Sequence, residues 1–143
     1  MKIRLMTAIG LCGALVQTAT AGSFDGTVHM LCATSQLQEC YVGQGCQTVN
    51  HATSDFPKFL QVQVKDSVVV GLAGGQVTGN STIDHIEHID NKLMLGGAED
   101  GSASAHDGVS WSLVIEETNG TLTAAAAGDG VVYIAFGHCT PKN

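Results

Sequence analysis

The sequence predicts an all-β domain, built as an antiparallel up-and-down meander of about eight or nine strands. Three observations support this class: the chain holds 18 glycines, it is rich in Val, Ile and Thr, and its apolar runs are short and separated by turn-forming residues. No segment has a helical apolar face of useful length. A barrel of the lipocalin or calycin type is the simplest closed form of such a meander, and a two-sheet sandwich is the alternative.

The first 21 residues have the pattern of a cleaved signal peptide. Lys2 and Arg4 precede an apolar run over 5–16, and small residues follow at 19–21, where a signal peptidase cuts. The run is shorter than the roughly 20 residues of a membrane helix, so no transmembrane segment is expected. We therefore expect residues 1–21 to be removed and residues 22–143 to form a single β domain, secreted or periplasmic.

The first half of this domain begins with a strand at 26–33. Residues 34–58 are expected to be an irregular, cysteine-containing loop that caps one end of the fold. The clearest strand is F-L-Q-V-Q-V-K at 59–65, where Leu60, Val62 and Val64 alternate with polar residues and share one face. Turns at 66–67 and 73–75 then separate V-V-V-G-L at 68–72 from Q-V-T-G at 76–79.

The second half continues the meander through three further hairpins. Asp90-Asn91 separates D-H-I-E-H-I-D at 84–90 from K-L-M-L at 92–95, although the turn lacks glycine. A polar loop at 99–108 precedes S-W-S-L-V-I at 110–115. Asn119-Gly120 predicts the next turn, before L-T-A-A-A at 122–126, and G-D-G at 128–130 leads to the last strand, V-V-Y-I-A-F-G at 131–137.

The cysteines predict two disulfides. Loss of Cys12 with the signal peptide leaves an even number, Cys32, Cys40, Cys46 and Cys139, as expected of an exported domain in an oxidising compartment. Four cysteines allow three connectivities. We favour Cys40 with Cys46 across a local glycine-containing loop, and Cys32 with Cys139, which would tie the first strand to the last.

The charge excludes one class of partner. Formal net charge is −7, and cleavage would make it −9 because the leader holds two of the six basic residues and none of the thirteen acidic ones. Phosphate backbones would be repelled, and no basic patch is present, so no nucleic-acid partner is expected. We expect a monomer whose partner is an unidentified small molecule or protein.

The pattern W-S-L-V-I, T-N-G-T-L-T and F-G-H-C, with an early C-A-T and F-P-K-F-L, resembles a family of small exported bacterial β-proteins. That resemblance covers most of the mature chain and implies no activity. The architecture is also similar to lipocalin barrels. This second resemblance concerns architecture only, because the G-x-W motif of lipocalins is absent.

The stretch at 84–90 is a candidate metal site. A regular strand would place His85 and Glu87 on one face and Asp84, His88 and Asp90 on the other, and a bulge would bring the two sets closer. Imidazole and carboxylate groups suit a divalent ion such as zinc, copper or nickel. The alternative is a solvent-facing edge strand whose charges discourage pairing with another molecule. No other cofactor is expected.

Three functions remain open from the sequence. No catalytic signature is found, so we expect no enzyme and no catalytic residues. The first candidate is a binding protein that holds a small apolar or mixed ligand inside the barrel, lined in part by Leu60, Val62, Val64, Leu113 and Ile115. A periplasmic metal-binding protein is the second candidate. The third is a secreted inhibitor or interaction module that uses the loop around Cys40–Cys46.

Overall fold

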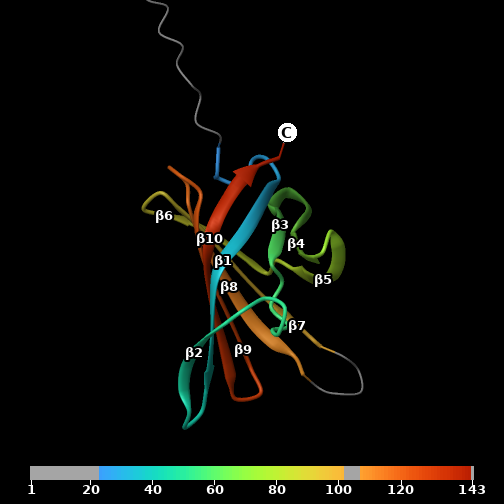
Figure 1. Ribbon diagram of the computed structural model, residues 1–143. Coiled ribbons are helices and arrows are strands. Elements are labelled where there is room, and N and C mark those ends of the chain that lie inside the picture. The colour runs from blue at the N-terminus through green and yellow to red at the C-terminus, as the bar shows by residue number, and fades with distance from the viewer. Residues whose placement is uncertain (1–22, 102–106, 143) are drawn as a thin grey trace, which may run out of the picture.

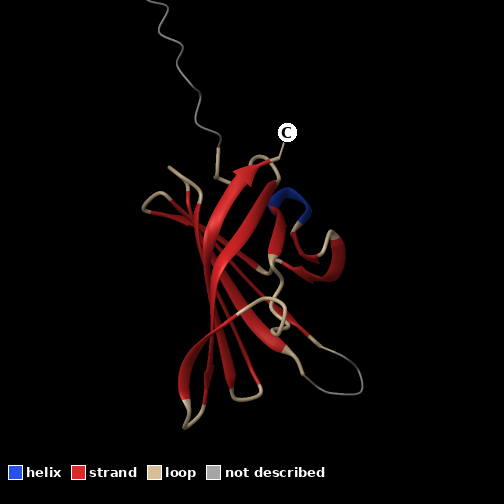
Figure 2. Ribbon diagram, viewed as in Figure 1, coloured by secondary structure: helices blue, strands red, loops and turns tan. Residues whose placement is uncertain are grey.

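The computed structural model describes residues 23–101 and 107–142. Within these residues the chain forms one antiparallel sheet, curled into a half-barrel (Figures 1 and 2). Its order is β5-β4-β3-β1-β10-β9-β8-β7-β6, and β2 pairs with β1 off this path. The strands are β1 (Met30–Tyr41), β2 (Gly45–Val49), β3 (Phe59–Gln63), β4 (Val68–Ala73), β5 (Gln76–Thr82), β6 (His85–Ile89), β7 (Lys92–Glu99), β8 (Val109–Glu116), β9 (Thr121–Gly128) and β10 (Val131–Pro141).

The predicted fold class is confirmed, and the sandwich alternative is not adopted, since the strands form a single sheet. No helix among the described residues is long and apolar enough to cross a membrane. The predicted signal peptide lies outside the described residues.

Both predicted disulfides are present, and each joins residues that face each other on neighbouring strands. Cys32 of β1 pairs with Cys139 of β10, with Cα atoms 3.8 Å apart. Cys40 of β1 pairs with Cys46 of β2, with Cα atoms 3.9 Å apart. The first bridge therefore joins the first strand of the chain, β1, to the last, β10, which run side by side in the middle of the sheet (Figure 1). We call this pairing of β1 and β10 the seam.

The two ends of the curled sheet are joined by Ile83 and Asp84, the only residues between β5 and β6. The amide of Ile83 donates a hydrogen bond to the carbonyl of Ser67, just before β4, at 2.9 Å. The amide of Asp84 donates to the carbonyl of Gly96 in β7, also at 2.9 Å. These two residues therefore carry the chain from β5, the strand at one end of the sheet, to β6, the strand at the other end.

The predicted hairpin at Asp90-Asn91 is confirmed without a glycine. Ile89 pairs with Lys92, so the turn has two residues, and both have positive φ, 49° for Asp90 and 58° for Asn91. Such a turn matches the twist of the flanking strands, and Asp and Asn tolerate this backbone region better than other side chains do.

The core fills one end of the half-barrel. Leucine, isoleucine, valine and methionine side chains from strands on both sides of the seam meet there, fully or almost fully buried: Met30, Val62, Leu93, Ile115 and Leu122. Phe24, which precedes β1, closes this end against Gly120, where a Cβ would lie 2.8 Å from the carbonyl oxygen of Cys139. The opposite end is not packed in this way, and the candidate site lies there.

Two sequence-based expectations need correction. Residues 34–58 are not an irregular cap, because 34–41 extend β1 and 45–49 form β2, which leaves the hairpin turn 42–44 and the irregular segment 50–58. The strand was hidden by a register shift between Thr34 and Gln36, which breaks the alternation of buried and exposed residues. Val64 also leaves the predicted strand, since β3 ends at Gln63 and Val64–Asp66 form a short 3-10 helix, η1.

Candidate functional site

The candidate site is a cavity of about 360 Å³ at the unpacked end of the half-barrel. Ligand pockets in proteins typically measure roughly 300 to 1,000 Å³. Strands β3, β4, β5, β8, β9 and β10 line it, together with the end of β7 and the segment 50–58. The cavity therefore lies within the curl of the sheet.

The pairing of the strands arranges the inner side chains in layers, because residues directly opposite each other share a face. The floor layer contains Leu95, Leu113, Ala124, Ala135 and Leu37, taken strand by strand from β7 to β1. The wall layer contains Gly97, Trp111, Ala126, Tyr133 and Glu39. In the mouth layer Glu99 faces Val109, and Gly128 faces Val131.

The wall layer gives the cavity its shape. Trp111 and Tyr133 both pair with Ala126, one from each neighbouring strand. Because Ala126 is small, a gap is left between the indole and the phenol. The Nε1 group of Trp111 donates a hydrogen bond to Oγ of Ser81 at 2.7 Å, so its polar atom is satisfied by the protein and the ring is left for apolar contact.

The same contact fastens β5 over the cavity. Oγ of Ser81 donates in turn to the carbonyl of Ala98 at 3.1 Å. Gly97 allows this close approach, because a Cβ there would meet the carbonyl oxygen of Thr82 and lie 2.5 Å from Cζ2 of Trp111.

The irregular segment 50–58 covers one side of the mouth. Its Phe56 ring lies 6.2 Å from the ring of Tyr133, centroid to centroid. His51 and the buried Thr34 hold the segment in place: Nε2 of His51 donates to the carbonyl of Thr34 at 3.1 Å, and Oγ1 of Thr34 donates to the carbonyl of Lys58 at 3.0 Å. The cap predicted for 34–58 is thus reduced to these nine residues.

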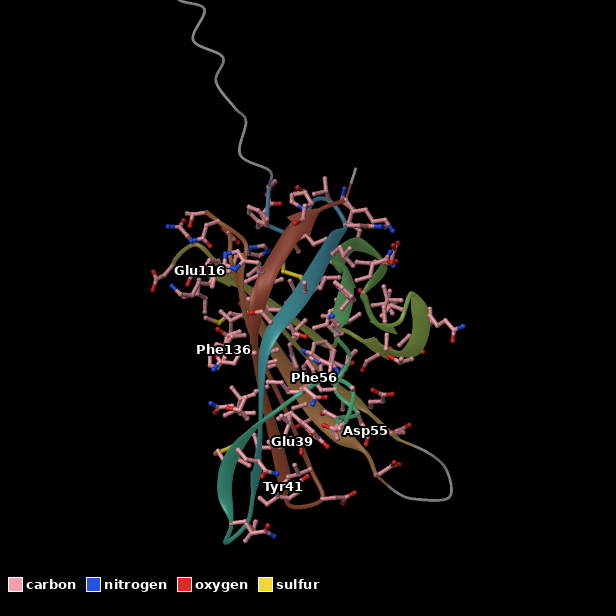
Figure 3. The ribbon with its side chains drawn as sticks, in the orientation of Figure 1. Glu39, Tyr41, Asp55, Phe56, Glu116 and Phe136 are labelled. Atoms are coloured by element: carbon pink, nitrogen blue, oxygen red, sulfur yellow. A yellow bond between two sulfur atoms is a disulfide. The ribbon has the colours of Figure 1, made fainter. Side chains whose placement is uncertain are left out.

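Carboxylates surround the cavity. Asp55, Glu99, Asp107 and Asp129 line it, and no Lys, Arg or His of the described chain does so. A fifth carboxylate, Glu39, lies in the wall layer beside Tyr133 and is only 8% exposed. Figure 3 shows Glu39, Tyr41, Asp55 and Phe56 together in the lower half of the molecule, far from Glu116.

Two tyrosines close to these carboxylates, Tyr133 and Tyr41, have raised pKa values. Burial raises the pKa of Tyr133, and the charges of Glu39 and Asp55 add to the effect. The hydroxyl of Tyr41 donates a hydrogen bond to Oε2 of Glu39 at 3.0 Å, and this bond is the main cause of the raised pKa of Tyr41.

Of the residues predicted to line a ligand site, Leu60 and Leu113 line the cavity. Val62 lies on the same face of β3 as Leu60, and Ile115 on the same face of β8 as Leu113, but both are one layer further from the cavity and fully buried in the packed core. Val64 packs against the core from η1. The alternation predicted which face points inward, but not where the packed core gives way to a cavity.

The stretch at 84–90 lies at an end of the sheet, and all five residues of β6 are exposed. Its register with β7 has no shift, so His85 and Glu87 share one face and His88 points to the other. Nδ1 of His88 lies 2.6 Å from Oε1 of Glu117, beyond the end of β8. Asp84 and Asp90 flank the strand. Among the described residues, no three His, Cys, Asp or Glu side chains form a group that could hold a metal ion.

The sequence did not single out Trp111, Tyr133 or Ala126, nor the carboxylates Asp55, Glu99 and Asp129. A signal for Trp111 was present, since it precedes Leu113 and Ile115 by two and four residues and so shares their face. The carboxylates come from separate turns and strand ends, and only the strand order brings them together.

No protein-family model, curated protein sequence or solved structure matches this chain.

Proposed function

We propose that the chain is an exported binding protein that holds a small, mainly apolar ligand in the cavity at the open end of the half-barrel. The observation that carries this proposal is the cavity itself, with the rings of Trp111 and Tyr133 on either side of Ala126. Apolar walls with a few placed polar groups are typical of small-molecule sites. The two disulfides are compatible with export to an oxidising compartment.

The chain carries its own probe for this function. Trp111 is the single tryptophan of the sequence and lines the cavity. We expect the neutral probe N-phenyl-1-naphthylamine to quench Trp111 fluorescence and to gain fluorescence itself as it binds.

A matched pair of variants tests the location. Ala126→Leu would fill the gap between the two rings and abolish probe binding. Ala127→Leu adds the same side chain to the next residue of β9, which is exposed and faces outward, and should bind the probe like the unsubstituted protein. Equal binding by both variants, or no binding by the unsubstituted protein, would contradict the proposal.

A second candidate function, an interaction module, is favoured by one feature. The β1–β2 hairpin is held by Cys40–Cys46, and Val42 at its tip is 84% exposed. Capture of a partner that is lost on Val42→Ser substitution, with Ala126→Leu having no effect, would favour this function over ligand binding.

A further inference from the structure

The volume of the cavity limits the size of the ligand, and the charges around the cavity limit the charge that the ligand can carry. Asp55, Glu99 and Asp129 line the cavity and form no ion pair with any described residue. Low-dielectric walls strengthen the field of such charges inside a cleft. An anionic ligand would meet only like charges there.

Glu39 is a second, independent observation. It pairs across β1 and β10 with Tyr133, which lines the cavity, but it does not line the cavity itself. It is more than nine-tenths buried, and among the described residues its side chain has only the hydroxyl of Tyr41 as a hydrogen-bond partner. No Lys, Arg or His of the described chain forms an ion pair with it. A buried carboxylate without a cation is costly, and a positive ligand group near it would lower that cost.

None of the described lysines lines the cavity. Lys65, Lys92 and Lys142 belong to η1, to the start of β7 and to the segment after β10, at the packed end. Lys58 lies closer to the cavity, but its Nζ lies 5.8 Å from the ring of Phe59, on the face opposite to the inward-facing Leu60. The cavity end therefore has a negative field that no described lysine cancels.

The aromatic walls fit the same ligand. Faces of indole and phenol rings attract ammonium groups through their quadrupole, and their apolar surface accepts a hydrocarbon body. A bare metal ion would leave this apolar surface unused.

We propose that the ligand is an organic ammonium compound, with a hydrocarbon or aromatic body between Trp111 and Tyr133 and its positive group among the carboxylates at the mouth. This inference rests on the proposed function, because it requires the cavity to be the binding site.

Three probes of one shape and different charge test it: 4-phenylbutylamine, 4-phenylbutanol and 4-phenylbutanoate, titrated calorimetrically into the full mature chain. We expect the amine to bind at least about tenfold more tightly than the alcohol, which corresponds to about 1.4 kcal/mol, and the carboxylate to bind more weakly than either. The preference for the amine should shrink as salt is added, because exposed charges are screened.

Two isosteric variants locate the charge effect. Glu99→Gln should weaken binding of the amine more than binding of the alcohol, so that the preference for the amine falls several-fold. Glu87→Gln, on exposed β6 and outside the cavity lining, is the control and should change neither affinity.

The outcomes separate the two proposals. If the alcohol binds as tightly as the amine, or if Glu99→Gln and Glu87→Gln behave alike, the ammonium inference is overturned while cavity binding stands. If none of the three probes binds, the inference is overturned, and N-phenyl-1-naphthylamine then decides the proposed function separately.

Discussion

At Gly97, the absence of a side chain lets β7 pass beneath Thr82 and Trp111. This contact fixes the indole in the cavity wall, since Trp111 is also held by Ser81. The neighbouring Gly96 has no such role, because the nearest atom to a Cβ there would be 3.7 Å away.

We therefore expect Gly97→Ala to lower the free energy of unfolding by about 1 to 3 kcal/mol, the usual cost of overpacking. Gly96→Ala should be nearly neutral. Urea unfolding of both variants, followed by Trp111 fluorescence, measures the difference. Equal stability of the two variants would show that Gly97 does not set the position of the indole.

Glu39 is expected to destabilise the ligand-free protein, because its buried carboxylate forms no ion pair with any described residue. Glu39→Gln keeps an oxygen that can accept the hydrogen bond from Tyr41 and removes the charge. The free energy of unfolding at neutral pH should rise by about 1 kcal/mol or more.

Urea unfolding at pH 7 tests this expectation, with Glu87→Gln on exposed β6 as the control. A loss of stability in Glu39→Gln that is absent in Glu87→Gln would mean that the carboxylate is stabilised in the unliganded protein.

At the scale of elements, the two disulfides constrain the chain very differently. Cys32–Cys139 spans 107 residues and joins β1 to β10, whereas Cys40–Cys46 spans six and closes one hairpin. In the chain-entropy description, a disulfide that closes a loop of roughly 100 residues stabilises the folded state by about 4.7 kcal/mol, and one that closes a loop of 15 residues stabilises it by about 3 kcal/mol.

Substitution of both members of each pair by alanine should reveal this difference. The variant lacking Cys32–Cys139 should lose more stability, also because both side chains are buried. The variant lacking Cys40–Cys46 should lose about half as much, roughly 2 kcal/mol in the same description, and retain probe binding. A larger loss for the local bridge would contradict the view that the bridge between β1 and β10 contributes most to the stability of the sheet.

The elements also show why sequence prediction succeeded in some places and failed in others. Hairpins with short turns, such as Asp90-Asn91, depend on local backbone preferences and were predicted. The continuation of β1 through 34–41 was missed, because its pairing with β2 and β10 is not a local property and its polar residues lack a simple alternation.

At the scale of the whole molecule, the curl of the sheet brings residues of distant strands around one cavity that no single segment forms. The inward face of Leu113 and Ile115 was predictable from alternation, and so was the partnership of Cys32 and Cys139. The division of the interior into a packed core and a cavity was not, since it depends on which small residues, such as Ala126, meet which large ones across strands. The gathering of Asp55, Glu99 and Asp129 at one end was hidden for the same reason.

The separation of a packed end from an open, acidic end is the central claim, and a crystal structure of the protein with 4-phenylbutylamine tests it most directly. We expect the phenyl group between Trp111 and Tyr133, with the nitrogen directed toward the carboxylates at the mouth. Core side chains such as Leu93 and Ile115 should stay in place. A cavity filled by the protein's own side chains, or an amine bound only on the outer face of the sheet, would contradict the account.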